Sequence, residues 1–372
     1  MNAIGAIDLE DTDGLLAADR QGLLRASATA GAQVRAVAAA AEEGALDSLQ
    51  ADARPRSVIW VAGRGTAETA GAMLAATFSG VVSQPITVAS DAPPWIGPLD
   101  VLIVAGDDAG DPALVTAAAT GVRRGARVVV AAPYEGPLRD ASAGRAAVLE
   151  PRLWIPGEFG LSRYLAAGLA ALQTVDPRPS IDLELMADEL DAEALRNSAG
   201  RELFTNPAKT IAARMTGRRV ALAGDSAATV ALARHGSSVL LRIAHRVVAA
   251  AALADAVVAL RTAAESGDGG PSSVDALFHD EEIDGPLPER LRVLVLALAA
   301  ERTVVGARVA GLDEVDVIAA EDVPDVPAGS AGLGGAGGVR ISGAGGQRAE
   351  QQLAVLAVRL EMAAVYLRLA RG

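Results

Sequence analysis

Two kinds of apolar pattern follow one another along the first half of the chain. Short continuous apolar runs lack the in–out alternation of a half-exposed strand, which is typical of strands buried on both faces of a parallel sheet. Between the runs, apolar positions recur at helical spacing. Strand–helix–strand order predicts right-handed crossovers and a doubly wound α/β domain. The expected strands are 56–62, 85–89, 99–105 and 127–132, and the expected helices are 67–78, 112–124 and 163–174.

The same order returns in the second half, after helices predicted within 14–49 and an acidic helical connector over 176–200. Because the layout repeats, we expect two related lobes with a cleft between the carboxyl ends of their strands, where open α/β sheets bind ligands. The expected elements are a helix at 206–215, a strand at 218–223, helical structure over 227–260, strands at 292–298 and 315–319, and an amphipathic helix at 350–371.

These patterns predict an α/β protein with two three-layer αβα domains and helical segments at both ends. The predicted divisions are an N-terminal helical segment at 1–54, a first α/β domain at 55–175, an acidic helical connector at 176–205, a second α/β domain at 206–349 that includes a glycine-rich loop at 329–347, and a C-terminal helix at 350–372.

Composition narrows the function classes. The 372 residues are 51% hydrophobic and carry a formal net charge of −13, which argues against nucleic-acid binding because that needs a basic face. The sequence has no cysteine and three histidines, so thiol chemistry and cysteine-ligated metals are excluded, and we expect no metal site. The acidic start and the lack of a long apolar run predict a cytoplasmic protein without a secretory signal or membrane span.

Two turns follow predicted strands. Residues 63–66 stand between a strand and a helix, and helix N-termini bind anions through free N–H groups. The alternative interpretation is an ordinary tight turn between a strand and a helix, in which glycine provides backbone freedom. In the turn at 106–111, three aspartates would repel a phosphate, and Asp111 before Pro112 predicts a helix cap.

The densest group of titratable side chains lies at 278–285. His279 stands beside Glu281 and Glu282, and a histidine next to carboxylates suits general acid–base catalysis near neutral pH. A solvated acidic turn is the alternative interpretation.

Four stretches, in order, resemble the bifunctional phosphoglucose/phosphomannose isomerases, which are built from two sugar-isomerase (SIS) domains. The stretch at 63–71 is similar to the family's opening glycine-rich loop, and 100–142 is similar to its phosphate-loop region. The stretch at 204–211, with Asn-Pro-Ala-Lys at 206–209, is similar to the family's Asn-Pro-Ala-Lys segment. The turn at 278–285 resembles the family's His-Asn-Glu turn, and the final helix ends in a similar way.

The resemblance implies two SIS domains, a homodimer, and cofactor-free aldose–ketose isomerisation of glucose 6-phosphate, mannose 6-phosphate or fructose 6-phosphate. In the family a glutamate is the base, and the histidine of the His-Asn-Glu turn assists ring opening from the partner subunit. Carried onto this chain, the catalytic candidates are His279, Glu281 and Glu282, and the substrate- and phosphate-binding candidates are Gly63, Arg64, Gly65, Thr66 and Arg163.

The chain differs from the family at the segments expected to bind the phosphate and to supply the base. The Ser/Thr phosphate loop is replaced by the aspartates of 106–111, and the segment 241–246, where the base is expected, has no glutamate. Two hypotheses follow. One is a phosphosugar isomerase with a rearranged site and impaired activity. The other is a non-catalytic SIS-fold protein that binds a sugar phosphate or a protein partner in a regulatory role.

Overall fold

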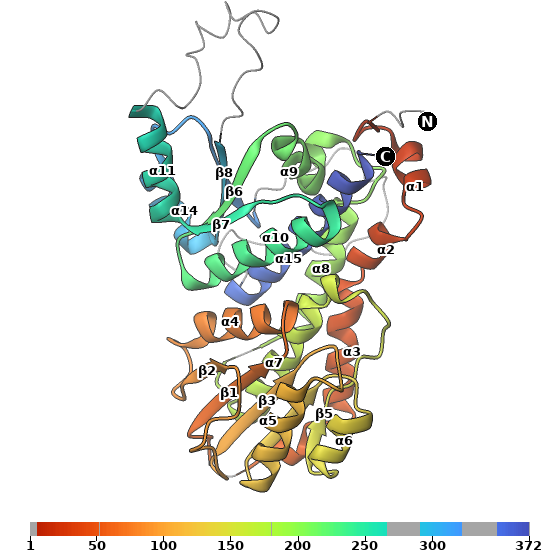
Figure 1. Cartoon of the computed structure of the whole chain (residues 1–372), viewed down its shortest axis with the longest axis vertical. Helices are drawn as coiled ribbons and strands as arrows, with labels where there is room; N and C mark the ends of the chain where they lie inside the picture. Colours follow the sequence, from red (N-terminus) through yellow and green to blue (C-terminus); the bar gives the residue numbers. More distant parts are fainter. Residues whose placement is uncertain (1–5, 52, 180, 266–290, 322–347, 372) are drawn as a thin grey trace, which may run out of the picture.

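The structure, a computed structural model, describes residues 6–51, 53–179, 181–265, 291–321 and 348–371 (Figure 1). The first half contains α1 (Thr12–Ala18), α2 (Leu23–Ser27), α3 (Ala30–Glu42), η1 (Asp47–Leu49), β1 (Ser57–Ala62), α4 (Thr66–Phe78), β2 (Ile86–Ala89), β3 (Asp100–Ala105), α5 (Pro112–Arg123), β4 (Arg127–Ala131), α6 (Gly136–Ser142), β5 (Ala146–Val148), η2 (Gly157–Phe159) and α7 (Leu161–Val175).

The second half contains α8 (Leu183–Arg196), η3 (Leu203–Thr205), α9 (Pro207–Met215), β6 (Arg219–Gly224), α10 (Ala227–Ala244), β7 (Ala249–Ala252), α11 (Leu253–Glu265), β8 (Leu291–Ala297), η4 (Ala299–Glu301), α14 (Arg302–Val309), β9 (Val315–Ala319) and α15 (Ala349–Leu369). The hydrophobic pattern did not predict α6, β5, β7 and α14, which are all short. The predicted α/β class is confirmed.

Both sheets are parallel, and the four described strands of the second sheet follow the order of the first four strands of the first sheet. The first runs β2-β1-β3-β4-β5 and the second runs β7-β6-β8-β9. Alternate residues of the first sheet enter different cores: Trp60 and Ile103 lie with α4 and α7, whereas Ile59 and Leu102 lie with α5. The predicted absence of in–out alternation is therefore explained by helices on both faces.

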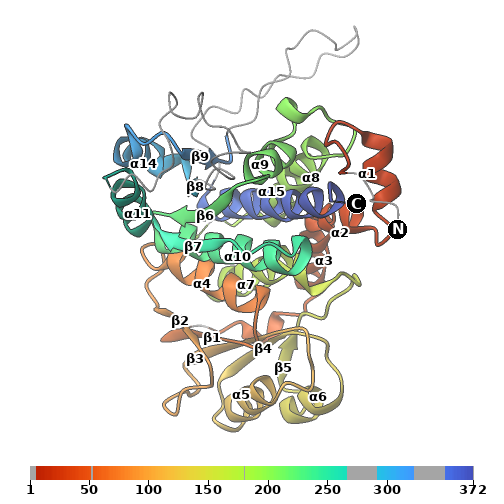
Figure 2. The same cartoon turned by 45° about the horizontal axis from the view of Figure 1, so that its top comes forward.

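Helices fill the space between the two sheets (Figure 2). One large hydrophobic core includes the inner faces of both sheets together with α4, α7, α10 and α15, and α4 contacts α10 directly. Helices α11 and α14 cover the opposite face of the second sheet. The expected open cleft between strand ends is therefore replaced by a packed helical layer that leaves small pockets.

The expectation of continuous helix over 227–260 is wrong. His245 adopts a left-handed conformation (φ 51°) that ends α10, and β7 then pairs with β6 in parallel, with Ala249 opposite Ala221. Alanine favours helix, so the sheet edge that β6 offers overrides the local preference of four alanines.

The final helix was expected to be amphipathic, and this is also wrong. Helix α15 is buried along nearly its whole length, in contact with α8, α9 and α10. Two of its buried charged residues pair with side chains of neighbouring helices: Glu361 pairs with His235, and Arg359 pairs with Glu193. A helix that is buried all round does not need a polar face.

The Asn-Pro-Ala-Lys segment has a structural role here. The Asn206 side chain accepts a hydrogen bond from the Lys209 backbone at 2.9 Å, and Pro207 occupies the first turn of α9. The Lys209 ammonium is buried and donates to the carbonyls of Ala199 and Arg201, each at 2.8 Å. Burial lowers the pKa of Lys209. The segment therefore ties α9 to the chain that precedes it.

Because of a buried carboxylate after α7, we expect the free energy of unfolding to decrease at acid pH. Asp176 accepts a hydrogen bond from Arg178 Nε at 2.8 Å, and this pairing lowers its pKa to about 2. A lowered pKa stabilises the fold above the ordinary pKa of a carboxyl, and the contribution is lost as pH falls toward 2. We expect Asp176→Asn to cost about 1 kcal/mol at pH 7, because half-exposed Arg178 is screened by solvent, and little at pH 2.

Urea unfolding at several pH values measures this difference, with Asp188→Asn at an exposed ion pair as the control. A cost that stays constant from pH 7 to pH 2 would contradict the assignment.

Candidate functional site

The turns that follow the strands of the first sheet gather at its carboxyl edge, because parallel strands all end on the same side. Neighbouring strands β1 and β3 lead into helices that lie on opposite faces of the sheet. The turns at 63–66 and 106–111 therefore meet at the point where the strand order reverses, which is the usual ligand position in such sheets.

The turn after β1 leaves the start of α4 without a side-chain cap. Gly65 stands at the cap position with φ 64°, a conformation that glycine tolerates. Thr66 is buried, and its hydroxyl donates to the carbonyl of Gly157 at 3.1 Å. Arg64 is exposed. The first N–H groups of this 13-residue helix therefore remain available to an anion.

Helix α10 provides basic side chains opposite this turn. A pocket of about 250 Å³, here called the α4–α10 pocket, has Gly65 and Thr66 on one wall and Arg234 and Arg242 on the other. A Cβ placed on Gly65 would lie 3.8 Å from Arg242 Nη1. Arg242 Nη2 also contacts Glu158 Oε1 at 2.6 Å. Arg234 forms no ion pair within the described part of the chain.

A buried histidine–glutamate pair lies behind the α4–α10 pocket. His235 lines the pocket, and its Nε2 is 2.8 Å from Glu361 Oε1. Glu361 is a buried residue of α15, and its burial raises its pKa. This pair joins α10 to α15 and positions the pocket wall.

The turn after β3 holds its carboxylates with the chain's own donors. Asp107 accepts from Arg163 at 2.6 Å and from the Tyr164 hydroxyl at 2.5 Å. Burial raises the pKa of Tyr164 and keeps its proton in place. Asp111 caps α5 by accepting from Ala113 N at 2.9 Å, which confirms the predicted cap. Two positions suited to a bound anion are therefore occupied by carboxylates.

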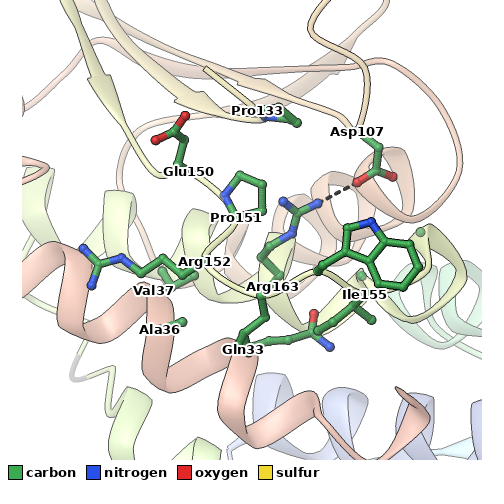
Figure 3. A pocket seen from close by; sticks show the side chains of 14 residues that line it. Gln33, Ala36, Val37, Asp107, Pro133, Glu150, Pro151, Arg152, Ile155 and Arg163 are labelled. Carbon is green, nitrogen blue, oxygen red and sulfur yellow. Dashed lines mark hydrogen bonds and ion pairs between the residues drawn. The ribbon is translucent and has the colours of Figure 1, made fainter. Parts of the chain in front are cut away.

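A second pocket, here called the Asp107 pocket, opens beside this turn (Figure 3). It measures about 280 Å³ and lies between α3, the carboxyl ends of the strands and the start of α7. Figure 3 shows Asp107 and Arg163 paired on one side, and Glu150 and Arg152 on another. Its lining also includes Gln33, Ala36, Val37, Pro133, Pro151, Leu153, Trp154, Ile155, Gly157 and Gly160.

The structure brings only some of the sequence-predicted residues together. Gly63, Arg64, Gly65 and Thr66 form one turn, and Arg163 is directed to Asp107 in the neighbouring pocket. The remaining candidates lie outside the described residues: His279, Glu281 and Glu282.

Sequence reasoning missed the residues that other elements bring to this edge. Arg234 and Arg242 come from α10, Gln33 comes from α3, and Trp154 follows β5. Each is an ordinary residue in its local sequence, so no local signal marked it. Within the described ranges, no three histidine or acidic side chains are grouped as a metal site, and no helix there has the length and apolar character needed to cross a membrane.

Comparison with solved structures identifies the fold as the SIS-domain fold of phosphosugar isomerases. Tagatose-6-phosphate ketose/aldose isomerase from Escherichia coli matches with a TM-score of 0.60 at 13% identity, over 100% of this chain and 96% of that one. The C-terminal domain of glucosamine-fructose-6-phosphate aminotransferase from Francisella tularensis matches with a TM-score of 0.55 at 11% identity, over 94% and 96%. Identities this low establish a shared fold alone.

No family model and no curated protein sequence matches the chain. The resemblance to the bifunctional phosphoglucose/phosphomannose isomerases therefore stays a prediction.

Proposed function

We propose that this SIS-fold protein binds a sugar phosphate at the carboxyl edge of its first sheet, with the phosphate in the α4–α10 pocket. The observation that carries the proposal is the convergence of the uncapped α4 N-terminus with Arg234 and Arg242 of α10. The helix end supplies N–H donors and a partial positive charge, Arg234 supplies a full charge, and Arg242 adds donors although it also pairs with Glu158. The names of tagatose-6-phosphate ketose/aldose isomerase and glucosamine-fructose-6-phosphate aminotransferase, two proteins of similar fold, contain sugar phosphates and support this ligand class.

The proposed role is binding rather than fast isomerisation. The phosphate loop expected after β3 contains Asp107 and Asp111, and the chain's own donors hold both carboxylates. The segment 241–246, where the family resemblance expects a glutamate base, contains no glutamate. We therefore favour a regulatory sugar-phosphate-binding protein over an isomerase. The proposal includes a cytoplasmic homodimer. Its ligand would be glucose 6-phosphate, mannose 6-phosphate or fructose 6-phosphate.

The binding proposal predicts a ligand-dependent rise in thermal stability. Fructose 6-phosphate at ten times its dissociation constant should stabilise the protein by about 1.4 kcal/mol. Arg242→Ala should weaken binding by about tenfold or more, because it removes a charged donor from the pocket. Thermal-shift titrations with the three hexose phosphates measure both effects.

Arg123→Ala provides the matched control, since Arg123 lies at the far end of α5 and outside both pockets. The melting temperature of each variant without ligand separates a binding loss from the loss of the Arg242–Glu158 contact. The absence of a shift with all three sugar phosphates, or an equal shift in Arg242→Ala, would refute the proposal.

A further inference from the structure

A histidine at the back of the α4–α10 pocket is hydrogen-bonded through only one of its two ring nitrogens. His235 of α10 lines this pocket although the residue is 2% exposed, and its Nε2 lies 2.8 Å from Glu361 Oε1 of α15. Its other ring nitrogen, Nδ1, forms no hydrogen bond within the described part of the chain. Nδ1 is not among the enclosed, unpartnered polar atoms of those residues, so it is accessible from the pocket.

The number of protons on the His235–Glu361 pair determines whether Nδ1 is a donor. A net charge is costly in a buried position, and burial raises the pKa of Glu361, so the pair is most stable when it is neutral overall. A neutral pair has two exchangeable protons. Among the described residues the carboxyl group of Glu361 has His235 as its partner, so one proton lies between Oε1 and Nε2 and the other is on Nδ1.

The other charged groups that line the pocket leave Nδ1 available. Arg234 and Arg242 of α10 are donors and do not accept a proton from Nδ1. Glu158 of η2 is bonded to Arg242 at 2.6 Å, and Glu68 of α4 is an exposed residue. Strands β6, β7 and β8, which also pack against α10, add no charged side chain to the described lining. Donors from the start of α4, from α10 and from the core therefore meet in one pocket, which suits a group with several acceptor oxygens.

We propose that His235 is an anion-binding residue of the α4–α10 pocket, donating its Nδ1–H to the bound phosphate, and that Glu361 is the positioning residue that keeps this proton on Nδ1. The inference rests on the proposed function and adds to it a neutral donor from the core, beside the helix end and the arginines. Sugar phosphates and inorganic phosphate share the acceptor oxygens that this donor recognises.

Two substitutions of His235 separate the pocket contact from the core contact. In His235→Gln the side-chain amide replaces Nε2 beside Glu361, but no donor remains at the Nδ1 position. In His235→Asn the amide nitrogen replaces Nδ1, but the contact with Glu361 is lost. We expect His235→Gln to weaken the binding of fructose 6-phosphate and of inorganic phosphate about tenfold, and His235→Asn to stay within about threefold of the wild-type dissociation constant. A purely structural role of His235 predicts the reverse order.

Isothermal titration calorimetry of the full chain measures both dissociation constants. The melting temperature without ligand reports the core contact, and it should fall further in His235→Asn than in His235→Gln. Equal phosphate binding by the wild type and His235→Gln would overturn this inference and leave the proposed function standing. Absence of wild-type binding for both ligands would overturn the two together.

The position of the ring proton is a second test, made on the wild-type chain. Two-bond ¹H–¹⁵N spectra of the protein labelled with ¹⁵N-histidine should show His235 protonated at Nδ1 at pH 7. This signal should be lost in His235→Gln and should shift when inorganic phosphate is added. A ring protonated at Nε2 alone would overturn the proposal, because Nδ1 would then be an acceptor that repels the phosphate oxygens.

Discussion

Purified protein is expected to convert fructose 6-phosphate into glucose 6-phosphate at least about 10²-fold more slowly than a phosphoglucose isomerase assayed in parallel. Proton transfer by a positioned base contributes roughly 10²–10⁴ in rate, and the helix segment expected to supply that base presents Arg242. The carboxylates of the 106–111 turn also remove the phosphate contacts that would position the sugar. A coupled assay that follows glucose 6-phosphate measures the rate.

The control for that assay is His279→Ala, which removes the histidine that sequence resemblance assigns to ring opening. Any slow turnover that belongs to this protein should fall further in the variant, whereas turnover from a contaminating isomerase should not change. Turnover comparable to that of the reference enzyme, and lost in His279→Ala, would show that the protein is an isomerase and would contradict the binding role proposed here.

Arg359→Met is expected to lower the free energy of unfolding by about 3 kcal/mol, the lower end of the cost of removing one partner of a buried ion pair, because Arg196 still pairs with Glu193 at 3.0 Å. Arg359 is almost fully buried in α15, and its Nε donates to Glu193 Oε1 at 2.8 Å. Its Nη1 donates to the Ala319 carbonyl at the end of β9, also at 2.8 Å. Although burial opposes ionisation, Arg359 keeps the pKa of Glu193 below its ordinary value.

Urea or thermal unfolding measures this cost, with Arg35→Ala as the matched control. Arg35 also joins two elements, α3 and α8, through Asp188 and Asp191, but its pairs are exposed and should contribute about 0–1 kcal/mol. Glu193→Gln in the Arg359→Met background should recover part of the loss, because it removes a buried charge that has lost its buried partner and keeps only Arg196. A cost for Arg359→Met no larger than that of the control would show that the buried pair does not stabilise the join between α15 and α8.

The 106–111 turn shows that a position in the sequence does not by itself predict the role of a residue in the folded protein. The local sequence identified Asp111 as a cap, and the structure confirms it, because capping depends on residues within one helical turn. The partner of Asp107 was not predictable in this way. Arg163 is 56 residues away in sequence and reaches Asp107 only because α7 returns to the carboxyl edge of the sheet.

Local patterns by themselves determined the α/β class, most buried strands and the N-terminal cap of α5, since these depend on hydrophobic spacing and on hydrogen bonds between near neighbours. Tertiary structure decided the rest. The alanines of β7 became a strand because β6 offered an edge, and α15 became a central helix because α8, α9 and α10 pack around it. The pockets likewise combine side chains from distant elements, such as Gln33 with Trp154 and Gly65 with Arg242, whose proximity arises only when the chain is folded.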